Sequence, residues 1–210
     1  MTTNTDAIRR AAPAVALRAA SPYPWPYDGA VSADRLGLLI VGAQHGIATR
    51  CARTAETLAA IERVAHATAR AGGSIIRTRH GTAARRRPGP LPRPGSPGYA
   101  PLPGRADIVI DCPGFDAFFS TPLAQSLSSR SVTHLLICGL WLEGPVHSSL
   151  RAANDQGFEC ALLTDACAPS DPGLKNGAIN SIEMSGGIFG AVASSDSALA
   201  ALHTNPPEES

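Results

Sequence analysis

Short apolar runs alternate with segments of helical periodicity along most of this chain, and this alternation limits the fold more than any other feature. Leu36–Val41 is apolar throughout, which is typical of a strand buried on both faces of a sheet. The segment 54–71 carries apolar residues at helical spacing, and two glycines end it. Further strands are expected at 75–76, 108–110, 133–138, 158–164 and 189–193, and further helices from 121, over 144–157, over 173–185 and over 195–203. Strands that alternate with helices predict an α/β fold, with a parallel sheet covered by helices on both faces.

Length, charge and cysteine spacing exclude several other classes of protein. A chain of 210 residues suits one α/β domain and is short for two. Only 17% of the residues are charged and the net charge is +1, so bulk electrostatics favour neither a nucleic acid nor a membrane as partner. The five cysteines show no C-x-x-C spacing, which indicates a reducing compartment. With neither a signal-peptide core nor an apolar run of membrane-spanning length, we expect a cytoplasmic protein.

The chain divides into one domain with two tails. Residues 1–20 are small and polar, and we expect a flexible tail with at most a frayed helix. Ser21–Gly29 alternates prolines with three aromatic rings, which favours an extended strap lying across the domain rather than a sticky linker. The domain is predicted to cover 21–203, followed by a tail at 204–210.

One stretch, Arg77–Pro103, breaks the alternation with many Arg, Pro and Gly residues. Basic, proline-rich segments cannot build a core, so we expect a solvated loop. The alternative is a contact with an anion or with RNA. No aromatic residue interleaves the Arg85–Arg87 run, so we do not expect a nucleic-acid partner.

Four motifs resemble the isochorismatase-like cysteine hydrolases, and within them the biuret and ureidoacrylate amidohydrolase branch. Residues 22–29 (P-Y-P-W-P-Y-D-G) are similar to the branch's N-terminal stretch, and 111–118 (D-C-P-G-F-D-A-F) resembles D-K-P-G-x-x-A-F. Residues 146–160 resemble V-H-x-T-x-R-x-A-N-D-R-G-F-E-C, and 186–193 resembles G-G-V-F-G-A-V-A. The resemblance covers about 21–202, with an interruption over 47–105. It implies a single three-layer α/β/α, Rossmann-like domain with a mostly parallel six-stranded sheet, commonly assembled into dimers or tetramers.

The family's chemistry uses a cysteine nucleophile, an aspartate that moves the proton and a lysine that balances charge. The aspartate belongs to a motif like L-L-V-I-D-M-Q-N, and here Gly42 takes its place in L-L-I-V-G-A-Q-H. The lysine of D-K-P-G is Cys112. The nucleophile of G-x-x-T-D-x-C-V-H falls on Pro145, within G-L-W-L-E-G-P-V-H. The resemblance therefore implies that all three catalytic residues are replaced.

Proline removes more than a thiol from the nucleophile's position. The resemblance implies that the nucleophile's backbone N–H helps to form the oxyanion hole, and proline has no N–H to donate. Loss of one such donor costs about 3 kcal/mol of transition-state stabilisation. Proline in a first helical turn is otherwise well tolerated. We also expect Trp141, which replaces a small residue, to occupy space that a substrate needs.

Ligands of parallel sheets bind at the carboxyl ends of the strands. The residues expected to line that crevice are Gln44, His45, Cys112, Phe118, Trp141, Glu143 and His147. Glu143 could cap the helix after it, and a packing role is expected for His147. Neither His66 nor His80 has the neighbours of an Asp-x-His-x-x-His cluster, so we predict no metal and no cofactor.

The sequence leaves two functional interpretations. The first is a catalytically inactive family member that serves as a structural or regulatory subunit, or that binds a small carboxamide-like ligand. Its partner would be a second copy in a homo-oligomer, or an active paralogue in a hetero-oligomer. The alternative is an active amidohydrolase that cleaves a C–N bond of a urea-derived or carboxamide substrate, with Cys112 paired to His45 or His147.

Overall fold

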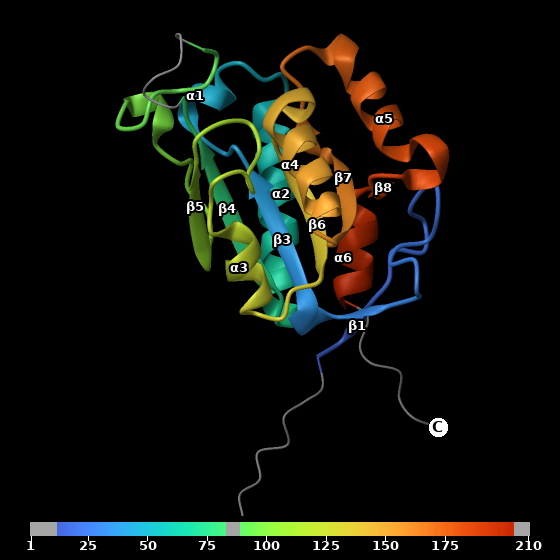
Figure 1. Ribbon diagram of the computed structural model, residues 1–210. Coiled ribbons are helices and arrows are strands. Elements are labelled where there is room, and N and C mark those ends of the chain that lie inside the picture. The colour runs from blue at the N-terminus through green and yellow to red at the C-terminus, as the bar shows by residue number, and fades with distance from the viewer. Residues whose placement is uncertain (1–11, 83–88, 204–210) are drawn as a thin grey trace, which may run out of the picture.

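A computed structural model describes residues 12–82 and 89–203, and its centre is a six-stranded parallel sheet (Figure 1). The strands lie in the order β5-β4-β3-β6-β7-β8, and each neighbouring pair is parallel. They span Leu36–Val41 (β3), Ser74–His80 (β4), Ile108–Cys112 (β5), His134–Leu140 (β6), Glu159–Ala168 (β7) and Ala191–Ala193 (β8). The predicted α/β class and the six-stranded sheet are confirmed.

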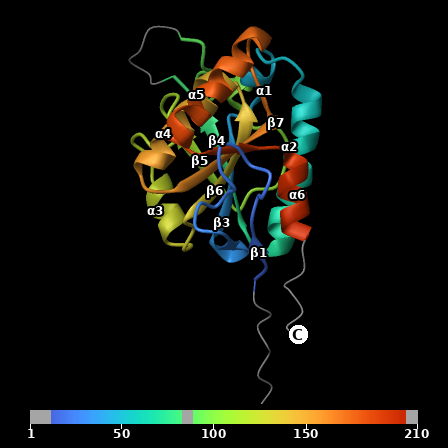
Figure 2. The same cartoon turned by 90° about the vertical axis from the view of Figure 1, so that its right-hand side faces the viewer.

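Helices cover both faces of this sheet and complete the three layers (Figure 2). The helices α2 (Thr54–Ala71) and α6 (Ser195–His203) pack on one face. The helices α3 (Leu123–Ser128) and α4 (His147–Asp155) cover the other, with α5 (Lys175–Gly187) beyond them at the β8 edge. Short helical turns are α1 (His45–Ala48), η1 (Ala33–Arg35), η2 (Pro97–Tyr99), η3 (Leu142–Val146) and η4 (Pro172–Leu174).

Burial explains why these strands and helices could be anticipated. Every residue of β3 is buried, as its unbroken apolar run predicted. Helix α2 spans the predicted range and turns its apolar stripe, including Ile61, Val64 and Ala65, into the core. Gly72 ends it in the left-handed conformation, with φ 96°. Each fully buried Leu or Ile contributes about 1.5–3 kcal/mol. In the described part of the chain, no helix combines the length and the apolar character that a membrane span requires.

The N-terminal segment differs from the expected tail. From residue 12 onward it belongs to the fold, because the two-residue strand β1 (Ala14–Val15) pairs antiparallel with β2 (Val31–Ser32). Val15 and Leu17 are buried against the core. These two apolar side chains lie two residues apart, which is the period of a strand. Residues 1–11 and the predicted tail at 204–210 lie outside the described residues.

The aromatic strap is anchored at two points. Leu17 and Trp25 exchange backbone hydrogen bonds (2.6 and 3.1 Å), and Ser21 exchanges two with Val192 of β8 (2.9 and 2.7 Å). The Trp25 ring is fully buried, whereas Tyr27 is 81% exposed. The strap therefore lies across the domain as expected, but Trp25 provides most of its burial.

The predicted loop Arg77–Pro103 starts too early. Strand β4 continues to His80, and Arg77 is a buried residue within it. Its guanidinium lies 3.6 Å from Glu62 of α2 and donates to the carbonyl of Pro103 (3.3 Å). A partner carboxylate on another element lets an arginine occupy an interior strand, and sequence patterning does not show that partner. The Arg85–Arg87 run lies outside the described residues.

Candidate functional site

The three positions that the resemblance assigns to catalysis meet at one edge of the sheet. Gly42 directly follows β3, Cys112 is the last residue of β5, and Pro145 lies in the turn between β6 and α4. Because the strands are parallel, their carboxyl ends share this edge. These three residues therefore lie at the end of the sheet where a ligand is expected to bind.

Gly42 is held in a conformation and a space that favour glycine. Its φ is 67°, in the left-handed region. A Cβ atom there would lie 3.1 Å from the carbonyl oxygen of Leu140 and 3.2 Å from the side chain of Ile47. The backbone around position 42 has thus closed over the place from which an aspartate side chain would project.

Cys112 points into the core rather than into open space. Its Sγ lies 3.7 Å from the carbonyl oxygen of Ile110 and 3.9 Å from that of Ala117. Burial, with smaller contributions from Asp111 and Asp116, raises the pKa of the thiol to about 12. The thiolate is the nucleophilic form, so this cysteine is a small apolar side chain at neutral pH.

Around Pro145, the backbone N–H groups of residues 144–147 are not available to an oxyanion. The carbonyl oxygen of Trp141 accepts from the N–H groups of Gly144 (3.1 Å) and Val146 (3.4 Å). Pro145 has no N–H, and the N–H of His147 bonds to the carbonyls of Leu142 and Gly144. Each N–H from 144 to 147 is therefore either absent or already used. An oxyanion hole needs donors that point at the developing charge.

The Trp141 side chain packs beside the turn that precedes α4. Its ring meets Phe115 edge to face, with centroids 5.3 Å apart. The ring also covers Gly144, where a Cβ would lie 3.0 Å from it. Around it is a second apolar cluster, separate from the main core, made of Ile47, Ala48, Cys51, Leu91, Leu102, Phe115, Leu140, Trp141 and Ala168. This cluster lies beside the carboxyl ends of the strands, where a ligand is expected to bind.

The predicted crevice residues Gln44, His45 and Phe118 have different surroundings. The buried Gln44 amide accepts from the N–H of His80 (2.6 Å) and donates to the carbonyls of His80 (3.3 Å) and Tyr99 (3.2 Å), so it joins β4 to η2. His45 is exposed. Phe118 packs against Phe158 beside the main core, with centroids 5.8 Å apart. Gln44 and Phe118 are thus used in packing.

Glu143 and His147 both reach toward the segment after β7. Glu143 accepts from the N–H groups of Ser170 (2.9 Å) and Asp171 (3.2 Å) and from the Ser170 hydroxyl. It therefore holds a neighbouring loop instead of capping its own helix. His147 Nε2 lies 2.7 Å from the hydroxyl of Ser181 in α5, and burial lowers the pKa of its imidazole. This contact agrees with the packing role expected for His147.

The structure does not pair Cys112 with a histidine. The hydrogen-bond partners described for the thiol are two backbone carbonyls, His147 bonds to Ser181, and His45 faces solvent. Nucleophilic catalysis needs the base within hydrogen-bond reach of the nucleophile. The geometry supplies no support for the alternative dyad.

One residue of the site, His80, was not among the expected ones. It ends β4 in register with Cys112, and its Cδ2 would lie 3.9 Å from a Cβ on Gly42. Its Nδ1 lies 2.8 Å from the carbonyl oxygen of Gly114 and its Nε2 2.7 Å from the Thr78 hydroxyl. Burial lowers the pKa of this imidazole to about 4. The available signal was the apolar start of this strand at Ile75 and Ile76, because a strand of ordinary length from there reaches His80.

Solved structures share this architecture. A cysteine hydrolase from Pseudomonas syringae pv. phaseolicola 1448A superposes with a TM-score of 0.72 at 17% identity, over 82% of this chain and 94% of that one. A putative isochorismatase from Burkholderia xenovorans LB400 gives a TM-score of 0.72 at 23% identity, over 82% of this chain and 89% of that one. At these identities the likeness shows the fold: a Rossmann-like α/β/α domain of the hydrolase type.

The family itself is shown by sequence. The model of the isochorismatase domain matches residues 37–197, and the chain belongs to this family. A ureidoacrylate amidohydrolase, RutB, from Methylorubrum extorquens is 33% identical over 100 residues, which is 47% of this chain and 40% of that protein. The aligned segment thus spans about two fifths of the length of that curated relative.

Proposed function

We propose that this chain is a catalytically inactive member of the isochorismatase family that acts as a subunit beside another chain of the same fold. The observation that carries the proposal is the turn at Pro145. It lacks the thiol and an N–H of its own, and the neighbouring N–H groups bond to the carbonyl of Trp141. Two separate requirements of amide hydrolysis, a nucleophile and an oxyanion hole, are therefore unmet at one position.

The energetic deficit supports the same conclusion. One lost oxyanion donor costs about 3 kcal/mol, or about 10²–10³ in rate. With a pKa of about 12, the Cys112 thiol would be ionised in on the order of one molecule in 10⁵ at pH 7. The edge-to-face contact of Trp141 with Phe115 adds a steric block. The apolar contacts of Trp141 also favour a subunit role over the binding of a small carboxamide-like ligand.

Activity measurements test the first half of the proposal. Purified protein should hydrolyse biuret, ureidoacrylate-like compounds, nicotinamide and isochorismate no faster than the buffer blank. Cys112→Ser serves as the diagnostic variant, because it removes the thiol with little change in volume. Turnover by the wild type that disappears in Cys112→Ser would overturn the proposal and establish the alternative amidohydrolase.

The proposed docking face includes the ends of α5. Leu174 just before the helix, Met184 near its end and Ile188 just after it are each about half exposed, at 52%, 48% and 51%. Oligomers of one fold use self-complementary patches, so a diverged copy that keeps the patch can bind an intact relative. We therefore propose a hetero-oligomer with an active family member where one is encoded, and a homodimer otherwise.

Native mass spectrometry tests this second half. The chain should form a dimer or larger assembly alone, or a mixed assembly when co-expressed with an active isochorismatase-family protein of the same genome. Met184→Glu with Ile188→Glu should abolish assembly. Phe119→Glu is the matched control, since Phe119 is also exposed but lies just before α3. A chain that stays monomeric with every relative offered would exclude the subunit role.

A further inference from the structure

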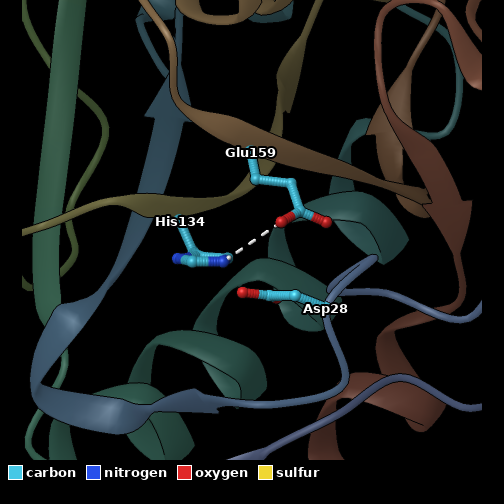
Figure 3. A group of neighbouring side chains, drawn as sticks. All are labelled: Asp28, His134 and Glu159. Atoms are coloured by element: carbon cyan, nitrogen blue, oxygen red, sulfur yellow. Dashed lines mark ion pairs between the residues drawn. The ribbon is translucent and has the colours of Figure 1, made fainter.

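A group of three metal-ligating side chains lies at the end of the sheet opposite the crevice (Figure 3). His134 and Glu159 are the first residues of β6 and β7, and Asp28 comes from the strap. One ligand atom of each residue lies within 4.8 Å of the other two. Three segments far apart in the sequence thus direct nitrogen and oxygen ligands to one point.

The imidazole of His134 has a hydrogen-bond partner at one ring nitrogen and an ion-pair contact with Glu159 at the other. Its Nδ1 lies 2.8 Å from the Thr133 hydroxyl, while its buried Nε2 has no hydrogen-bond partner. The Glu159 carboxylate lies 3.2 Å from Nε2, but the contact does not meet the geometry of a hydrogen bond. A buried ring nitrogen without a hydrogen bond is costly unless a further partner occupies the space that it faces.

The two carboxylates leave that space open to a cation. The N–H of Tyr27 donates to Oε1 of Glu159, which fixes the carboxylate and leaves Oε2 on the side of His134. Figure 3 shows the carboxyl groups of Asp28 and Glu159 on the Nε2 side of the ring. Asp28 is exposed, so one of the three ligands reaches solvent.

We propose that Asp28, His134 and Glu159 bind one divalent transition-metal ion, for which Zn²⁺ is the best fit, with water as a fourth ligand. One imidazole nitrogen and two carboxylate oxygens match the ligands of Zn²⁺, and the two negative charges balance the ion. Bonds of about 2.0–2.2 Å place tetrahedral ligands about 3.4 Å apart. The exposed Asp28 side chain can close the remaining gap by rotation.

The surroundings of the ring support a metal in two further ways. The Thr133 hydroxyl at Nδ1 is the kind of outer contact that orients a metal-binding imidazole. The carboxylates of Glu159 and Asp28 lie beside the same ring, and their negative charges would attract a cation to this position. Bound metal would pin the strap to the start of β6 and β7. The Trp25 ring lies edge to face with His134, at 5.6 Å, and would report the event.

Metal titration of the full chain tests the proposal. After removal of bound metals with a chelator, Zn²⁺ should bind at one site per chain by isothermal titration calorimetry. Co²⁺ in its place should give the visible absorption bands of a tetrahedral N/O site. Asp28→Asn and Glu159→Gln keep size and shape, and each should weaken Zn²⁺ binding at least tenfold. Asp34→Asn, on an exposed carboxylate near the strap that bonds to Ser32, is the matched control and should leave affinity unchanged.

Two results would contradict the proposed metal site, and they differ from each other. Wild-type protein that binds neither Zn²⁺ nor Co²⁺ would overturn the site. So would binding that survives both variants, because it would belong to other surface histidines or to Cys51. Circular dichroism spectra that match the wild type would confirm that Asp28→Asn and Glu159→Gln are folded. The variants lie away from the crevice, so the outcome does not depend on whether the chain is catalytically inactive.

Discussion

Restoring the three family residues is the most informative perturbation, because the surroundings of each have changed. In Gly42→Asp, a side chain must adopt the left-handed conformation, at a cost of about 1–2 kcal/mol, beside the Leu140 carbonyl at 3.1 Å. In Cys112→Lys, an ammonium enters a site that buries the present side chain, which costs several kcal/mol unless the chain rearranges. Pro145→Cys returns the thiol and an N–H.

The triple variant should therefore be destabilised and remain inactive. A loss of several kcal/mol is a large part of the roughly 5–15 kcal/mol that holds a domain folded. Urea unfolding followed by circular dichroism would measure this loss, and amidase assays with biuret and ureidoacrylate-like substrates would measure activity. Addition of Trp141→Ala to the triple variant controls for the blocked crevice. Robust hydrolysis by the triple variant, with stability within about 1 kcal/mol of the wild type, would refute the reasoning.

Two further predictions concern stability. Burial lowers the folded-state pKa of His80 to about 4, whereas its unfolded value is 6.5. The neutral imidazole therefore contributes its full share of folding stability above pH 6.5. This share is lost as the pH falls toward 4, by about 3 kcal/mol at most. Urea unfolding of His80→Gln should show a weaker pH dependence over this window, whereas exposed His66→Gln should match the wild type. Trp25→Ala should cost about 3–5 kcal/mol, and exposed Tyr27→Ala less than about 0.5 kcal/mol. Equal losses for the two aromatic variants would show that the strap is not anchored by Trp25.

Most of the fold could be predicted because local pattern and tertiary burial agree. The β3 run and the α2 stripe are buried as their periodicity indicated. The errors occur where long-range partners override the local pattern. Arg77 belongs to a strand because Glu62 lies beside it, and Val15 belongs to the fold because it pairs with Val31. Neither partner is visible in a local window of sequence.

The sequence indicated which positions belong to the candidate site, but not which atoms each side chain contacts. Gly42, Cys112 and Pro145 were located by the resemblance of their flanking motifs to the family, and the structure places them at the carboxyl ends of β3, β5 and β6. His80 was missed because a strand-ending histidine among arginines resembles a loop. The proposed metal ligands were missed for a different reason. Residues 28, 134 and 159 lie on three segments, and only the register of β6 with β7, where His134 pairs with Glu159, brings two of them together.

The changes at the crevice depend on one another, and this supports the loss of catalysis as a state of the whole site. The Trp141 ring can rest on position 144 only because that residue is glycine, and the Trp141 carbonyl takes the N–H groups on either side of Pro145. Gly42 in turn lets the Leu140 carbonyl approach a position where a side chain would stand. If the proposed inactivity holds, hydrolysis by the family's residues would require the backbone around Gly42 and the turn at Pro145 to change together, and a single substitution would not achieve that.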